Sequence, residues 1–121
     1  MKPNALQAIG NTPLVDVSIL SPDPKVEIYG KLESVNPTGS VKDRAARSLI
    51  QTAEKEGLIK PGDTILEPTS GNTGLGLAMI GRIKGYNVKV VMPASVPPER
   101  VHLLEAFGAE VILSHKDKGT N

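Results

Sequence analysis

The chain has 121 residues, which suits a single compact domain, and 39% of them are hydrophobic, enough for a modest core. Its 14 basic and 13 acidic side chains leave a net charge of +1, so no overall field favours nucleic acid or an anionic membrane. The absence of cysteine excludes a disulfide framework, a thiolate metal site and a cysteine nucleophile.

The N-terminal third predicts two short strands and a turn. Residues 13–17 are a short candidate strand, and residues 26–33 alternate apolar with polar side chains, which is typical of a half-buried strand. The polar turn Asn-Pro-Thr-Gly follows at 36–39 and leads into the first predicted helix.

That helix is predicted over residues 41–56, and Gly57 follows its end. Ser40 and Asp43 have the spacing of a capping box, which marks the start of the helix. Its predicted apolar face consists of Ala45, Ala46, Leu49, Ile50 and Ala53.

From residue 64 onward, short β-branched runs alternate with amphipathic segments. The pattern predicts strands at 64–67, 87–92 and 110–113, and helices at 71–84 and 98–107. Gly85 and Gly108 occupy positions typical of helix C-caps, and Pro98 that of a first helical residue. This alternation implies right-handed crossovers. We therefore predict an α/β fold of three αβα layers, with a parallel sheet covered on both faces.

Two loops, 36–44 and 67–74, each connect a strand to a helix N-terminus, where ligands of open parallel sheets gather. We expect Lys42 at the second helical position, where the helix dipole and nearby Arg44 both favour a neutral amine. Because a neutral amine attacks aldehydes, Lys42 suits imine formation with a carbonyl cofactor. A solvated helix lysine is the alternative, and Asp43 and Arg44 are typical of capping and surface charges.

The second loop is rich in small residues, which leave successive backbone N–H groups uncovered at a helix start. Such a nest suits a carboxylate or a phosphate. The hydroxyls of Thr69, Ser70 and Thr73 and the amide of Asn72 add further donors and acceptors. A glycine-rich helix cap around Gly71 is the alternative, which explains the glycines but not the hydroxyls.

Other templates do not fit the sequence. The glycines of Gly-Asn-Thr-Gly-Leu-Gly at 71–76 lack the spacing of a dinucleotide fingerprint, and no phosphate-loop motif is present. No metal site is expected, since His102 and His115 have no second ligand at metal spacing. The lack of a Gly-x-Ser-x-Gly elbow argues against serine hydrolase chemistry.

Six motifs in register carry a resemblance to a known family over essentially the whole chain. They are Ile-Gly-Asn-Thr-Pro-Leu at 9–14, Asn-Pro-Thr-Gly-Ser-Val-Lys-Asp-Arg at 36–44, Glu-Gly-Leu-Ile-Lys-Pro-Gly-Asp-Thr at 56–64, Pro-Thr-Ser-Gly-Asn-Thr-Gly at 68–74, Lys-Gly-Tyr at 84–86 and Gly-Ala-Glu at 108–110. Together they resemble the cysteine synthase (O-acetylserine sulfhydrylase) and cystathionine β-synthase group of fold-type II pyridoxal-phosphate enzymes.

This resemblance implies a role for each loop. Lys42 would hold pyridoxal 5′-phosphate as a Schiff base and remove the substrate's α-proton, and Asn72 would hydrogen-bond the cofactor's 3′ oxygen. The substrate's α-carboxylate would be bound by the loop Thr69, Ser70, Gly71, Asn72 and Thr73. The implied reaction is β-replacement, in which an activated serine such as O-acetylserine exchanges its β-substituent for sulfide to give cysteine. The cofactor would supply the electron sink.

The resemblance also implies a domain division. Residues 1–40 would belong to a larger domain, and residues 41–121 to most of a small N-terminal α/β domain. The remainder, with a second glycine-rich loop for the cofactor phosphate and a residue facing the pyridine nitrogen, would lie beyond a chain that is expected to be truncated. Two departures from the family pattern are Thr38 and the proline-rich segment 96–99, and neither is expected to touch the chemistry.

Several alternatives stay open within and outside this chemistry. Cystathionine β-synthase and threonine synthase use related chemistry, and a non-catalytic α/β module that binds an amino acid or a protein is an answer of another class. For the enzyme, the family implies a homodimer and docking of a serine acetyltransferase tail, with no nucleic acid or membrane partner. No leader and no apolar run of about 20 residues occurs, so we expect a cytoplasmic protein.

Overall fold

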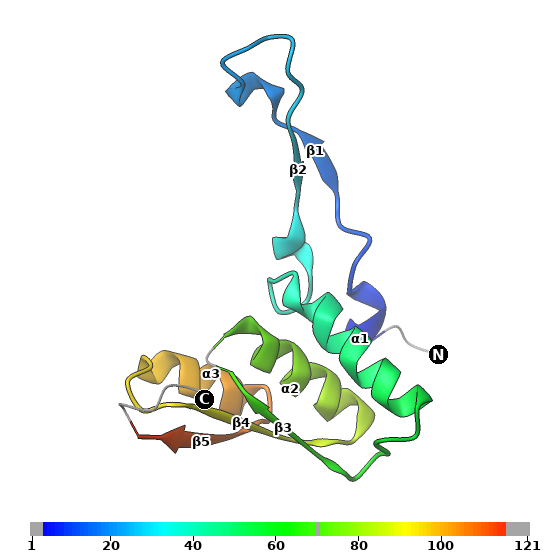
Figure 1. Ribbon diagram of the computed structural model, residues 1–121, viewed down its shortest axis with the longest axis vertical. Coiled ribbons are helices and arrows are strands. Elements are labelled where there is room, and N and C mark those ends of the chain that lie inside the picture. Colours follow the sequence, from blue (N-terminus) through cyan, green and yellow to red (C-terminus); the bar gives the residue numbers. More distant parts are fainter. Residues whose placement is uncertain (1–3, 70, 116–121) are drawn as a thin grey trace.

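The computed structural model describes residues 4–69 and 71–115 (Figure 1). The strands are β1 (Leu14–Asp16), β2 (Tyr29–Lys31), β3 (Thr64–Pro68), β4 (Asn87–Pro93) and β5 (Glu110–Ser114). The helices are α1 (Lys42–Lys55), α2 (Asn72–Lys84) and α3 (Pro98–Ala106), and short 3-10 turns occupy η1 (Ala5–Ala8), η2 (Ser18–Leu20) and η3 (Glu33–Val35). In the described ranges, no helix is long and apolar enough to cross a membrane.

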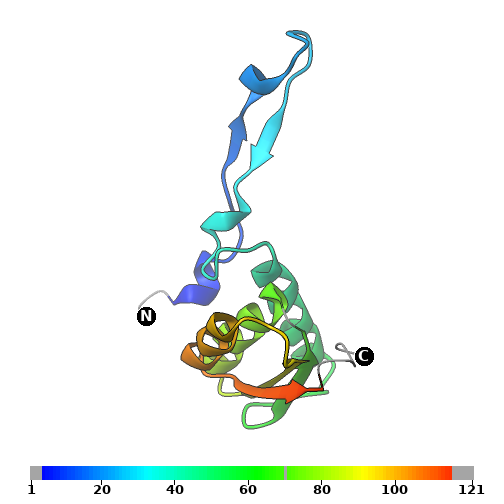
Figure 2. The same cartoon turned by 90° about the vertical axis from the view of Figure 1, so that its left-hand side faces the viewer.

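Strands β3, β4 and β5 form a parallel sheet in that order, which confirms the predicted α/β class. Both crossovers run in the same direction along the sheet, so α2 and α3 lie on one face, as Figures 1 and 2 show. On this face the central strand β4 buries Val88, Val90 and Met92, whereas the flanking Ile65 of β3 and Val111 of β5 are partly buried. On the opposite face, Leu66 and Ile112 are exposed and Lys89 pairs with Glu110 at 2.9 Å. The described residues thus supply the sheet and one of the two expected helical layers.

Helix α2 lies at the centre of the core. It is covered by α1, by α3 and by the sheet, and eight consecutive residues from Gly74 to Gly81 are buried. Its end was predicted from local signals, because Gly85 adopts the left-handed conformation (φ 83°) of a C-cap. Pro98 likewise begins α3, as its fixed φ predicts.

The start and the apolar face of α1 differ in part from the prediction. Ala46 and Ile50 are buried, but Leu49 is 56% exposed and lines an open cavity. The predicted capping box is wrong. The Asp43 carboxylate accepts hydrogen bonds from the backbone N–H (2.8 Å) and the hydroxyl of Thr38 instead, and Asp43 is linked to Ser40 only by a backbone hydrogen bond, at 3.3 Å.

Strands β1 and β2 form an antiparallel hairpin that projects away from the α/β body (Figures 1 and 2). The strand predicted over 26–33 is only three residues long. Ile28 still accepts a hydrogen bond from the backbone N–H of Val17 at 2.9 Å, but η2 then turns the chain away from the hairpin ladder. Val26 and Ile28, predicted to be half-buried, are 49% and 36% exposed. No described element packs over the hairpin to cover these side chains.

Candidate active site

The first turns of α1 and α2 lie against each other, and this contact brings together the two main candidate residues. A Cβ added to Gly76 of α2 would lie 2.9 Å from the Cβ of Ala46 and 3.3 Å from the backbone oxygen of Lys42. Glycine therefore permits a close approach that a side chain would prevent. Lys42 is the first residue of α1 and Asn72 the first of α2, so both stand at this end of the helix pair.

Lys42 is exposed and is the first residue of α1, one helical position earlier than predicted. Its backbone N–H donates to the Ser40 hydroxyl at 3.1 Å. Within the described part of the chain its ammonium forms no ion pair. Arg44, expected to favour the neutral amine, is bound instead to the Glu33 carboxylate at 2.9 Å, which offsets its charge. Among the described residues, the Lys42 side chain is thus exposed and without an ion-pair partner.

Thr69 and Gly71 are hydrogen-bonded to each other immediately before the start of α2. The backbone N–H of Thr69 donates to the backbone oxygen of Val91 at 3.0 Å. The Thr69 hydroxyl accepts from the backbone N–H of Gly71 at 3.1 Å. Asn72 is exposed and Thr73 is partly buried, whereas the predicted site residue Ser70 lies outside the described residues. Within residues 4–69 and 71–115, no side chain caps α2, and the first N–H groups of this helix are of the kind that the nest hypothesis requires.

Local sequence reasoning missed a polar cluster behind the Lys42 loop. Thr12, Asn36 and Asp43 are buried polar residues, at 5%, 3% and 0% exposure. Hydrogen bonds from the Arg44 guanidinium, then from the Thr12 hydroxyl, lower the pKa of Glu33 from 4.5 to about 2. The signal that could have found the cluster is the co-occurrence of polar residues in the motifs at 9–14 and 36–44.

A cavity of about 360 Å³ adjoins Asn72 at the N-terminal end of α3. It is lined by Thr38, Asn72, Leu75, Pro97, Glu99, Arg100 and Leu103. Thr38 and Pro97 belong to the two departures that were expected to lie away from the chemistry, and the structure places both beside a candidate site residue. They therefore contribute to the shape of the surface around Asn72.

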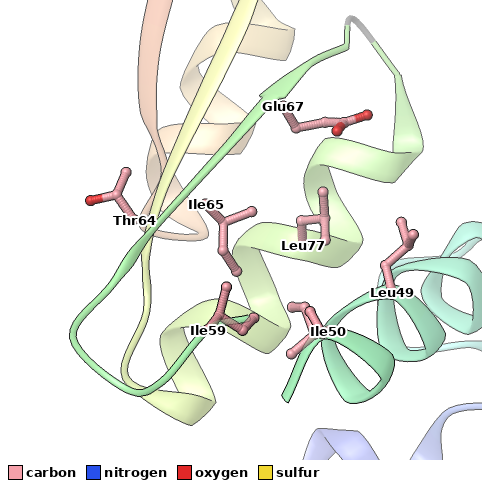
Figure 3. A pocket seen from close by; sticks show the side chains of 8 residues that line it. Leu49, Ile50, Ile59, Thr64, Ile65, Glu67 and Leu77 are labelled. Carbon is pink, nitrogen blue, oxygen red and sulfur yellow. The ribbon is translucent and has the colours of Figure 1, made fainter. Parts of the chain in front are cut away.

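A second cavity, of about 270 Å³, is apolar and contains no candidate site residue. Figure 3 shows Ile50, Ile59, Ile65 and Leu77 pointing toward one another between α1, α2 and β3, with Glu67 at the rim. Among the described residues, no group of three histidine, cysteine or acidic side chains could hold a metal ion.

Comparisons with known proteins agree with this arrangement. Residues 5–121 match the family described as "Pyridoxal-phosphate dependent enzyme". The chain is 57% identical over 113 residues to cysteine synthase B of Salmonella typhimurium and 53% identical over 111 residues to a probable cysteine synthase of Bacillus subtilis. These matches cover 93% and 92% of this chain but 37% and 36% of the relatives, so the chain spans little more than a third of their length.

A solved structure of O-acetylserine sulfhydrylase isoform 3 from Entamoeba histolytica superposes with a TM-score of 0.90 at 44% identity. The match covers 99% of this chain and 37% of that one. The fold of the described residues is therefore similar to that of a known sulfhydrylase.

Proposed function

Since the chain belongs to the family of pyridoxal-phosphate dependent enzymes, we propose that it is the N-terminal part of a cysteine synthase that exchanges the acetate of O-acetylserine for sulfide. The observation that carries this proposal is the pairing of α1 and α2 through Gly76, which sets Lys42 and Asn72 at the same end of two packed helices. Relatives named cysteine synthase at more than half identity support it.

The residues at this end fit pyridoxal 5′-phosphate. Lys42 offers an exposed amine without an ion-pair partner among the described residues, which suits covalent attachment of an aldehyde, and Asn72 offers an exposed amide for the cofactor's 3′ oxygen. When bound, the cofactor supplies an electron sink for the carbanion formed at the substrate's Cα. Lys42 would take the α-proton at its Nζ, and the family resemblance puts the loop for the cofactor phosphate beyond residue 121.

The 69–73 loop is proposed to bind the substrate's α-carboxylate. The N-terminus of α2 presents N–H groups and the positive end of the helix dipole. The sequence at this start is Thr69, Ser70, Gly71, Asn72 and Thr73. Capture of the carboxylate here would orient the Cα–H bond toward Lys42. It would also exclude water from the site as the loop closes.

We also propose that residues 1–40 belong to a larger domain and residues 41–121 to a small α/β domain. The projecting hairpin supports this division, because Leu14, Ile19 and Leu20 are 63%, 94% and 75% exposed on it. Side chains of this kind are normally covered by a further layer. A cytoplasmic homodimer that docks a serine acetyltransferase tail is the corresponding expectation for the full-length enzyme.

Absorbance titration with pyridoxal phosphate tests the proposal. The wild-type chain should develop the yellow colour of an amine-bound cofactor, which should shift when O-acetylserine is added. Lys42→Ala should abolish this change, whereas Lys55→Ala, which removes an exposed lysine from the same helix, should not. If both variants behave like the wild type, Lys42 is not the attachment site. If no colour develops with any protein, the chain by itself is an incomplete site, and cofactor attachment belongs only to a longer parent.

A further inference from the structure

One carboxylate behind the proposed site joins three separate segments of the chain. Glu33 Oε2 accepts hydrogen bonds from Arg44 Nε and Asn36 Nδ2, each at 2.9 Å. Its Oε1 accepts from the Thr12 hydroxyl at 2.6 Å and from Arg44 Nη2 at 3.1 Å. The arginine is thus bound in a two-pronged arrangement that only a guanidinium can form. We call Thr12, Glu33, Asn36 and Arg44 the Glu33 cluster.

The Glu33 cluster is packed too closely to be an incidental surface contact. A Cβ added to Gly10 would lie 2.9 Å from Arg44 Nη1, and Gly10 has a φ of 85° that disfavours any side chain. The N–H of Gly10 donates to Asn36 Oδ1 at 2.8 Å, and Arg44 Nη2 also reaches the Thr12 hydroxyl at 3.1 Å. The Glu33 side chain is only 21% exposed.

The Glu33 cluster binds the Lys42 loop at both of its ends. Asn36 begins the loop and Arg44 lies two residues beyond Lys42, so both flanks of the reactive lysine are bound to the same carboxylate. Between them, Asp43 is fixed by Thr38. The cluster therefore fixes the start of α1 to η3 and to residues 10–12, and the backbone oxygen of Lys42 at this start lies against Gly76 of α2.

We propose that Glu33 is a positioning residue, which acts through Arg44 and Asn36 to hold the Lys42 amine in register with Asn72. The inference rests on the proposed function. Glu33 touches neither Lys42 nor Asn72 by any hydrogen bond described for these residues, so its effect is indirect. Misplacement of a reacting group by about 1 Å can cost up to about 100-fold in rate, which is the scale of effect available to such a residue.

The same helix pair provides a matched control. At the opposite end of α1, Glu54 binds Lys84 Nζ at 2.6 Å and the Tyr86 hydroxyl at 2.9 Å, with 27% of its side chain exposed. Glu54→Gln therefore weakens a comparable ion pair of α1 that is remote from Lys42. Glu33→Gln preserves the size of the side chain and removes its charge, and Arg44→Lys retains the charge but removes the two-pronged geometry.

Two measurements on the wild-type chain and these three variants test the inference. The first is amide hydrogen exchange of the 36–44 peptide without cofactor, and the second is the affinity for pyridoxal phosphate. We expect Glu33→Gln and Arg44→Lys to speed exchange in 36–44 and to weaken cofactor attachment by roughly 10- to 100-fold. We expect Glu54→Gln to lower the melting temperature without either effect.

The inference is overturned if exchange in 36–44 is unchanged in both cluster variants, or if Glu54→Gln produces the same exchange and attachment changes as they do. A wild-type chain that shows no Lys42-dependent attachment would instead overturn the assignment of cofactor attachment to this part of the enzyme alone. In that case the exchange measurement still decides whether the cluster orders the loop. The two failures are therefore distinguishable.

Discussion

Gly76 and Ala46 face each other across the α1–α2 contact so closely that a Cβ on Gly76 would lie 2.9 Å from that of Ala46. Gly76→Ala should force the first turns of the helices apart and destabilise the chain by about 1–3 kcal/mol, because overpacking displaces backbone as well as side chains. Thermal unfolding measures the loss. Pyridoxal phosphate attachment should weaken in parallel, since Lys42 and Asn72 are separated by the same movement.

Gly30→Ala is the control for this prediction. A Cβ at Gly30 would meet only ordinary contacts, the nearest being Val15 Cγ2 at 3.7 Å, and Gly30 lies in the hairpin, away from the helix pair. A Gly76→Ala chain as stable as the Gly30→Ala chain would show that the helices do not rely on the close approach.

Ile50 and Leu49 are adjacent on α1 but differ in burial, at 2% and 56% exposure. Ile50→Ala should cost about 2–5 kcal/mol of unfolding free energy because it leaves a cavity in the core. Leu49→Ala should change stability by no more than about 0.5 kcal/mol, as is usual for exposed positions. Urea unfolding of both variants gives the comparison, and equal losses would contradict the observed orientation of α1.

The lowered pKa of Glu33 predicts that the folded chain loses stability in acid. Its pKa is lowered from 4.5 to about 2 in the folded chain, mainly by Arg44 and then by Thr12. A carboxyl with a depressed folded pKa contributes stability that is fully present above pH 4.5 and is lost as the pH falls toward 2. Melting temperatures should therefore fall more steeply between pH 4.5 and 2 in the wild type than in Glu33→Gln. Parallel profiles of the two proteins would refute this assignment.

Thr38 supplies both hydrogen bonds that Asp43, which is 0% exposed, receives through its carboxylate oxygens. Thr38→Ala removes the hydroxyl donor and should destabilise the chain by about 1–3 kcal/mol, the cost of leaving a buried acceptor less satisfied. Thr38→Ser retains the hydroxyl and should recover most of the loss. Denaturant unfolding of the pair provides the test, and a serine variant as unstable as the alanine variant would implicate the methyl group instead.

Local signals in the sequence predicted the elements from residue 64 onward because each boundary is encoded by its own residue. Gly85 ends α2 with a positive φ, and Pro98 begins α3 with a fixed one. The strand predicted over residues 26–33 is longer than the observed β2, because its length depends on a partner strand and not on a residue of its own. Its alternating pattern is real, but a strand also needs a partner, and β1 offers only three residues.

The candidate site was predicted in part. The positions of Lys42 and Asn72 at two helix starts follow from the loop motifs, whereas the pairing of Glu33 with Arg44 and Thr12 joins residues 11 and 21 positions apart. No local period encodes such contacts. Periodicity also could not show that Thr38 would bind Asp43 in place of the expected capping partner Ser40.

Reductive trapping tests most directly the central claim that Lys42 is the cofactor-binding lysine. The chain would be incubated with pyridoxal phosphate, reduced with borohydride, digested and mapped by mass spectrometry, with Lys42→Ala in parallel. The account predicts one dominant phosphopyridoxyl group, on the peptide that contains Lys42, and its loss in the variant. Similar labelling of exposed lysines such as Lys55 and Lys60, or undiminished labelling of the Lys42→Ala chain, would contradict it.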